Sequence, residues 1–178
     1  MKQKLGMVLA VLLFAGMLQP AAQAVGTSAS SAILMEAESG RVLYEQNADE
    51  PRLIASITKL MTALVALESG HSLDETVTIQ AEDTRTEGSS LYLKAGDTVT
   101  LETLLYGLLL HSGNDAALAI ARFCGGSVEA FVAKMNEKAQ ALGMTRSSFA
   151  NPNGLNAEGH YSTARDMARL ARACLENE

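Results

Sequence analysis

The stretch that decides the fold is 53-LIASITKLMTALVAL-67, in which Lys59 is the only charged side chain. A helix that is apolar on nearly every side belongs in a protein interior. An ammonium group is costly to bury there unless it is paired or used. The segment therefore predicts a buried central helix, and it raises the question of what Lys59 does.

Ser56 offers an answer, because it precedes Lys59 by three residues and so lies on the same face of a helix. Burial lowers the pKa of a lysine. A neutral amine can take the proton of a serine hydroxyl, which typically accelerates a reaction about 10²–10⁴-fold. The alternative is a serine N-cap followed by a lysine that extends its amine to solvent. Both interpretations fit the spacing alone.

A second polar feature, 111-HSGND-115, separates two apolar segments that we expect to be helices beginning near Thr100 and Asp115. Unpaired polar groups between apolar helices are costly unless something uses them. Ser112 and Asn114, two residues apart, can both project from such a turn into a cleft. In the alternative, this is a plain loop in which Asn114 or Asp115 caps the following helix.

The order of the predicted elements indicates the α+β class, because strands come first and helices later. Residues 32–49 form a predicted β-hairpin, and 75–80 and 96–100 are short strand candidates. A two-stranded hairpin is only marginally stable alone, and no strong partner strand follows it, so we expect an incomplete sheet. The remaining expectations are a helix capped by Ser127, a turn at 151–154, a turn residue at His160, and a last helix with Thr163 and Asp166 at capping-box spacing.

Residues 1–24 have the three-part layout of a secretory signal peptide. Lys2 and Lys4 precede an apolar run over 5–18, and Ala22-Gln23-Ala24 forms a small-residue cleavage site. The run is too short for a comfortable membrane span, although an uncleaved anchor is the alternative. We therefore expect cleavage after Ala24 and an exported protein.

Charge and cysteine content narrow the function further. Removal of Lys2 and Lys4 takes the net charge from −6 to −8, and no Lys/Arg cluster remains, which argues against a nucleic-acid partner. Cys124 and Cys174 allow one disulfide at most, and free buried thiols fit equally well. The three histidines show no metal-ligand spacing. We therefore expect neither a metal nor another cofactor.

Together the two polar motifs resemble a known signature, in which S-x-x-K is combined with S-D-N and K-T-G in penicillin-binding proteins and class A β-lactamases. Here the first motif is Ser56–Lys59, and the second is Ser112–Asn114, with Gly113 in the middle position. Long stretches carry the likeness from about Ser31 onward, including AILMEAESGRVLYEQNADEPRLIASITKLMTALVALE and EGSSLYLKAGDTVTLETLLYGLLLHSGNDAALAIA. The sequence resembles the low-molecular-mass penicillin-binding proteins, the serine-type D-alanyl-D-alanine carboxypeptidases.

This resemblance implies a serine β-lactamase/DD-peptidase-like fold, with a helical cluster beside an antiparallel sheet and the active site between them. It implies that Ser56 is the acylated nucleophile, Lys59 its general base, Ser112 a proton relay and Asn114 a ligand of a substrate amide. The implied substrate is a peptidoglycan stem peptide ending in D-Ala-D-Ala, and β-lactams would acylate the same serine. The implied location is the cell wall or the outer face of the cytoplasmic membrane, with no metal required.

The sequence departs from the family pattern because no Lys-Thr-Gly triplet follows Asn114. Residues 25–178 are therefore expected to be an incomplete DD-peptidase catalytic domain without the later sheet strands, inactive or nearly so alone, since loss of one oxyanion donor typically costs about 10²–10³ in kcat. Membrane association would need a C-terminal region that this chain lacks. The alternatives are a non-catalytic cell-wall or β-lactam-binding module and, less favoured because Gly113 replaces Asp, a β-lactamase.

Overall fold

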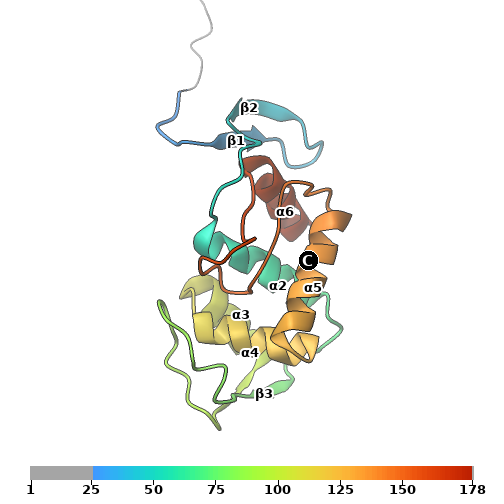
Figure 1. Cartoon of the computed structure of the whole chain (residues 1–178). Coiled ribbons are helices and arrows are strands. Elements are labelled where there is room, and N and C mark those ends of the chain that lie inside the picture. The colour runs from blue at the N-terminus through green and yellow to red at the C-terminus, as the bar shows by residue number, and fades with distance from the viewer. Residues whose placement is uncertain (1–25, 178) are drawn as a thin grey trace, which may run out of the picture.

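The computed structural model describes residues 26–177, so the predicted signal peptide lies outside the described residues. Two pairs of short strands and a group of helices make up the α+β architecture (Figure 1), and this confirms the predicted fold class. In chain order the elements are β1 (Ala32–Met35), β2 (Val42–Gln46), the 3₁₀ helix η1 (Ala55–Thr58), α2 (Lys59–Leu67), β3 (Thr76–Thr78), β4 (Thr98–Thr100), α3 (Leu101–Leu110), α4 (Asn114–Gly125), α5 (Val128–Ala141) and α6 (Ala164–Glu176).

The predicted N-terminal hairpin is confirmed, since β1 and β2 pair antiparallel with Ala32 opposite Gln46. It lies at one end of the molecule, next to α6 (Figure 1). The two later strand candidates do not join it. Instead β3 and β4 pair with each other, with Val77 opposite Val99, and form a second two-stranded sheet. The sequence indicated both strands but not their mutual pairing.

Three helix starts are capped by hydroxyl side chains, which satisfy backbone N–H groups that lack intrahelical partners, whereas α2 and α4 have no side-chain cap. Thr100, Ser127 and Thr163 accept from the backbone N–H three residues later, at the starts of α3, α5 and α6. The capping box predicted at Thr163 forms only on one side. The Asp166 carboxylate accepts instead from Arg146 N at 2.9 Å and Ser147 Oγ at 2.8 Å.

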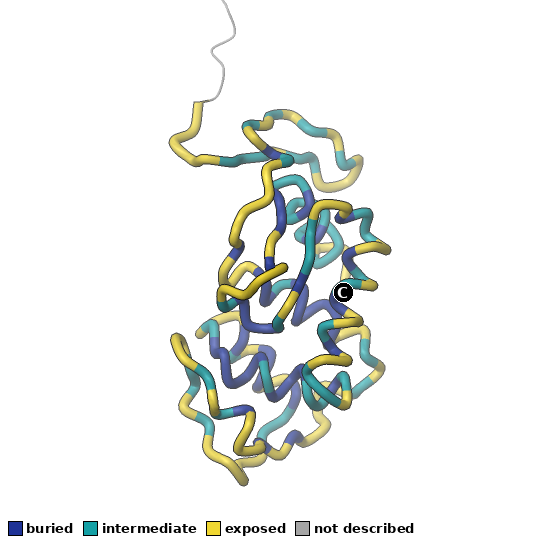
Figure 2. Tube along the Cα trace, viewed as in Figure 1, coloured by how far each residue is buried: buried dark blue, intermediate teal, exposed yellow. Residues whose placement is uncertain are grey.

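Helix α2 lies at the centre of the molecule, as its sequence predicts. Much of the buried part of the chain lies in α2, α3 and α4, shown in dark blue in Figure 2, and single faces of α5 and α6 complete it. Lys59, at the start of α2, is only 3% exposed, so the predicted burial of this amine is confirmed. The largest fully buried side chains include Met61, Leu64, Leu104, Leu108, Ile120, Phe131, Met135 and Leu170.

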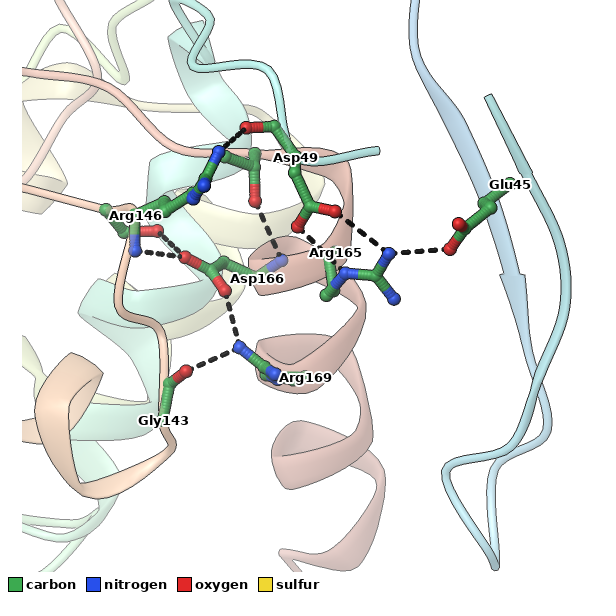
Figure 3. A network of polar contacts seen from close by, with 9 residues as sticks. Glu45, Asp49, Gly143, Arg146, Arg165, Asp166 and Arg169 are labelled. Carbon is green, nitrogen blue, oxygen red and sulfur yellow. Dashed lines mark hydrogen bonds and ion pairs between the residues drawn. The ribbon is translucent and has the colours of Figure 1, made fainter. Parts of the chain in front are cut away.

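A network of arginines and carboxylates attaches the hairpin to the helical part (Figure 3). Arg165 of α6 donates to Glu45 of β2 at 2.6 Å and to Asp49 at 2.8 Å. Arg172, further along α6, donates to the Ala37 carbonyl in the hairpin turn at 2.7 Å. These contacts hold the hairpin against α6, where its own two strands would be marginal alone.

Two smaller questions from the sequence are also answered. Cys124 and Cys174 are free thiols rather than a disulfide. Within residues 26–177, no single helix is both long enough and apolar enough to cross a membrane. The pair α4 and α5 meets both criteria only when taken together, and the two helices are bent by 85° at their junction.

We predict that Asp166→Ala lowers the free energy of unfolding by about 3 kcal/mol, because it leaves the part-buried Arg146 N–H and Ser147 hydroxyl without their charged acceptor. Its carboxylate is buried and also pairs with Arg169 at 2.8 Å. Urea unfolding followed by circular dichroism measures the change. The matched control on the same helix is Glu176→Ala, which removes an exposed ion pair at 3.5 Å and should cost less than about 1 kcal/mol. Equal losses in the two variants would contradict the role of the network.

Candidate active site

Ser56 lies on the single 3₁₀ turn η1 that precedes α2, and Lys59 is the first residue of α2. The predicted helix is therefore two joined elements rather than one. Ala55 begins the turn with a φ of 46°, which is unusual for a residue other than glycine. The result places an exposed serine directly beside a buried lysine.

Three oxygen atoms surround the Lys59 amine. Nζ lies 2.7 Å from Asn114 Oδ1, 2.7 Å from the backbone carbonyl oxygen of Asn153 and 3.2 Å from Ser56 Oγ. The structure thus brings together three of the four predicted site residues, Ser56, Lys59 and Asn114. It adds a fourth group, the Asn153 carbonyl, that sequence reasoning missed.

Burial lowers the pKa of Lys59 from 10.5 to about 8. This agrees with the direction that the sequence predicts, because a buried amine disfavours its charged form. A pKa near 8 leaves an appreciable fraction of the amine neutral around pH 7 to 8. Lys59 can therefore act as a proton acceptor in that range.

In its neutral form the amine has two hydrogens and one lone pair. The two carbonyl oxygens, of Asn114 and Asn153, can only accept, so they take both hydrogens. The lone pair then faces the remaining neighbour, Ser56 Oγ, which can donate its hydroxyl proton. The two closest contacts therefore orient the lysine lone pair toward the serine.

Asn114 is held in place on both sides of its side chain. Its Nδ2 donates to the Glu87 carbonyl at 2.6 Å, which fixes Oδ1 toward Lys59, and its backbone N–H donates to the Ser89 carbonyl at 2.8 Å. One N–H of the amide and one lone pair of Oδ1 remain available for another ligand. Helix α4 begins at Asn114 itself, one residue before the predicted start.

Asp115 anchors the loop that contacts Asn114. Its buried carboxylate accepts from Ser90 Oγ at 2.6 Å and from the backbone N–H groups of Leu91 at 3.0 Å and Leu93 at 3.1 Å. Burial raises the pKa of this carboxyl, but these hydrogen bonds and one from Ala116 N outweigh it, so the pKa of Asp115 is lowered overall. An ionised Asp115 thus fixes the wall of the site.

Ser112, the fourth predicted residue, lies at the turn between α3 and α4. Its backbone has a φ of 58°, in the left-handed region that a serine rarely adopts. Across residues 26–177, no hydrogen bond joins Ser112 to Ser56 or Lys59. The structure therefore places it close to Asn114 in the chain but without a hydrogen bond to the Ser–Lys pair in the described residues.

The loop 150–155 contains the NPNG sequence that was predicted only as a turn. Its Pro152 carbonyl accepts from Thr62 Oγ1 of α2 at 2.6 Å, next to the Asn153 contact with Lys59. Gly154 packs so closely that an added Cβ would lie 2.0 Å from the Ala55 carbonyl oxygen. The glycine in NPNG was the available signal, since glycine allows close backbone approach.

A polar cleft of about 380 Å³ opens beside these groups. Both loops and the η1 turn line it, and Ser56 is accessible from it. Within the described part of the chain, no group of three or more His, Cys, Asp or Glu side chains could hold a metal ion. The lining residues are Ala55, Ser56, Glu87, Gly88, Ser89, Asn114, Asn153, Gly154, Leu155 and Asn156.

The fold and the Ser–Lys pair define a protein of the serine β-lactamase/DD-peptidase fold class. The chain superposes on the D-alanyl-D-alanine carboxypeptidase DacD from Francisella tularensis with a TM-score of 0.85 and 36% identity, over 92% of this chain and 41% of that one. It superposes on penicillin-binding protein 5 from Haemophilus influenzae with a TM-score of 0.82 and 32% identity, over 87% and 47%. The profile of the D-alanyl-D-alanine carboxypeptidase family matches residues 18–178. The chain belongs to this family.

Curated relatives agree with this assignment. The chain is 43% identical to the D-alanyl-D-alanine carboxypeptidase DacF of Bacillus subtilis over 157 residues, which are 84% of this chain and 40% of the relative. It is also 43% identical to DacA of Escherichia coli strain K12 over 159 residues, again 84% of this chain and 40% of the relative. The chain thus spans between two fifths and about half of the length of the curated relatives that it matches.

We predict that Gly154→Ala destabilises the protein by at least about 2 kcal/mol, because its φ of 86° and the Ala55 carbonyl both oppose a side chain. Gly159→Ala is the matched control. Gly159 also has a positive φ, of 76°, but nothing lies within 4 Å of its Cβ position, so only about 1 kcal/mol of backbone strain is expected. Thermal or urea unfolding compares them. If the two losses were equal, close packing at Gly154 would not constrain the loop.

Proposed function

We propose that Ser56 is the nucleophile of a serine-type D-alanyl-D-alanine carboxypeptidase and that Lys59 is its general base. One observation carries the proposal. The buried Lys59 amine has two carbonyl acceptors at 2.7 Å and the Ser56 hydroxyl as its third neighbour at 3.2 Å. This is the geometry that a lysine needs to remove a serine proton.

In the proposed reaction, the neutral Lys59 amine takes the Ser56 proton as Oγ attacks the carbonyl carbon between the two terminal D-Ala residues. A new Oγ–C bond forms, and the resulting oxyanion collapses as the C–N bond breaks. Lysine returns the proton to the departing D-Ala amine. Water then attacks the ester carbonyl carbon and gives one proton to the Lys59 amine. As the C–Oγ bond breaks, Lys59 passes that proton to Ser56 Oγ, and the shortened peptide leaves as a carboxylic acid that keeps the other hydrogen of the water.

Asn114 and Ser112 have supporting roles in this proposal. The free N–H and lone pair of the Asn114 amide suit the complementary groups of a peptide bond in the substrate. Ser112 is proposed as a proton relay between the Ser–Lys pair and the leaving amine. For that role its hydroxyl must turn toward the pair once substrate occupies the cleft.

The proposed substrate is the peptidoglycan stem peptide that ends in D-Ala-D-Ala, and β-lactams should acylate the same serine. The proposed location is outside the cytoplasm, after removal of residues 1–24 as a signal peptide. Residues 25–178 are proposed to form part of a DD-peptidase catalytic domain. The names of the related carboxypeptidases and the family match support this proposal.

A chimaera tests the proposed nucleophile in a protein of full length. Residues 26–177 replace the matching segment of the Bacillus subtilis carboxypeptidase, and the product is incubated with fluorescent penicillin and a D-Ala-D-Ala peptide. We expect one label per chain on Ser56, located by mass spectrometry, and none in Ser56→Ala. Stoichiometric labelling of Ser56→Ala, or a folded chimaera that neither labels nor releases D-Ala, would refute the proposal.

The Lys59 pKa sets a further prediction in the same chimaera. Below about pH 8 the amine is mainly protonated and cannot accept the serine proton, so the labelling rate should rise with pH and level off above about pH 8. Lys59→Ala should remain folded but label about 10²–10⁴-fold more slowly, without this rise. Labelling reactions quenched at set times, at pH values from 5.5 to 9.5, measure the labelling rate of both proteins. If the labelling rate of the chimaera that retains both Ser56 and Lys59 did not change with pH, Lys59 would be excluded as the base.

A further inference from the structure

The sequence places His160 in a turn, and its backbone N–H does donate to the Ala157 carbonyl at 3.1 Å. Its ring, however, is 2% exposed and packs edge-on against Phe149, with ring centroids 6.0 Å apart and an interplanar angle of 82°. A buried imidazole in a turn is unexpected unless both ring nitrogens have partners. Both do.

The two partners define the tautomer of the ring. The Ala150 backbone N–H donates to His160 Nδ1 at 3.1 Å, so Nδ1 carries no hydrogen. The hydrogen of the neutral ring is therefore on Nε2, which lies 2.8 Å from Thr58 Oγ1 and donates to it. Burial lowers the pKa of His160, which also favours the neutral ring.

These two partners lie on the two segments that meet at Lys59, the η1 turn and the loop 150–155. Thr58 is fully buried and lies between Ser56 and Lys59, as the last residue of η1. Ala150 begins the loop whose Asn153 carbonyl accepts from the Lys59 amine. One ring thus connects the turn that carries Thr58 with the loop that begins at Ala150, and His160 itself lies 102 residues after Thr58 in the sequence.

The His160 ring holds the beginning of the loop, just after Phe149, whose backbone groups are bonded to the Asn136 side chain. Thr62 holds the Pro152 carbonyl, and Gly154 packs on Ala55, so the far part of the loop is fixed against α2. Ala150 is attached through the His160 ring. Without the ring, a part-buried N–H and the Thr58 hydroxyl would both need water as a partner. Because Thr58 directly precedes Lys59 in the chain, water at this place would reduce the burial that lowers the pKa of the Lys59 amine.

We infer that His160 is a positioning residue of this site: by bridging Thr58 and Ala150, it holds the Asn153 carbonyl against Lys59 and keeps the amine dry and oriented toward Ser56. The inference deepens the proposed function and rests on it for the effect on acylation. The effect on the lysine itself does not require that any substrate be turned over.

The test measures the ionisation of Lys59 directly. Lysine side chains of the 178-residue chain are labelled with ¹³C, titrated by NMR, and the Lys59 signal is assigned from its loss in Lys59→Arg. The unmodified chain should titrate at about 8. In His160→Leu, the pKa should move at least halfway back toward 10.5. In His160→Gln it should stay near the unmodified value, because a glutamine amide supplies both an acceptor and an N–H.

Two further variants keep the test decisive. Thr58→Val retains the shape of the side chain but removes the acceptor of Nε2–H. It should raise the Lys59 pKa as His160→Leu does. If His160→Leu does not fold, the result for Thr58→Val decides the test. His71→Leu is the control, since that ring contacts Glu75 and Phe123 instead, and it should leave the Lys59 pKa unchanged. An unchanged pKa in folded His160→Leu or Thr58→Val overturns the inference. A rise of the Lys59 pKa in His160→Gln equal to that in His160→Leu also overturns it, because the hydrogen bonds of the ring would then not be what holds the loop.

The same variants in the chimaera separate this inference from the proposed function. If His160→Leu raises the Lys59 pKa and slows labelling while His160→Gln does neither, both stand. If the Lys59 pKa responds as expected but Ser56 is never acylated, the proposed function fails and the positioning role remains. If Ser56 is acylated normally in every folded His160 variant, the inference fails and the proposed function remains.

Discussion

The site depends on how many hydrogens a neutral lysine amine carries. With two hydrogens and one lone pair, the Lys59 amine is fully oriented once two carbonyl oxygens take the hydrogens. Burial lowers the pKa of the amine and so raises its neutral fraction, and the two carbonyls orient it. Neither is sufficient alone. A buried amine without acceptors could rotate freely, and an exposed amine would remain an ammonium whose third hydrogen points at Ser56.

Each group that surrounds Lys59 has its own support elsewhere in the fold. Asn114 is held by a loop that the buried Asp115 carboxylate anchors. Asn153 is held by a loop fixed at Gly154 and, at its beginning, by His160. The chain just after His160 is fixed in turn, since Ser162 bridges the backbone of residue 52 and Asp166 accepts from the 146–147 segment. The ion pairs of α6 extend this support to the hairpin, so distant residues help to position one amine.

The sequence predicted local relationships well and distant ones poorly. The Ser56–Lys59 contact follows from helical spacing, and a charged residue in an apolar helix marked it for attention. Asn114 was found because a polar turn between apolar helices is costly. The Asn153 contact could not be found in this way, since every residue has a backbone carbonyl and only the tertiary structure selects one. The pairing of β3 with β4 and the burial of the His160 ring were missed for the same reason: each depends on partners far away in the chain.

The S-x-x-K spacing fits the structure more closely than an α-helix alone would suggest. In an α-helix, residues three apart are offset around the axis, whereas in a 3₁₀ turn they are eclipsed. Ser56 lies on such a turn and Lys59 is its C-cap, so hydroxyl and amine project in nearly the same direction. The strained Ala55 that begins the turn would cost on the order of 1–3 kcal/mol. Its carbonyl is the atom against which Gly154 packs, so the loop that supplies the Asn153 acceptor also holds the strained turn in place. The contact between Gly154 and Ala55 therefore couples the turn that carries Ser56 to the loop that supplies one of the two acceptors of Lys59.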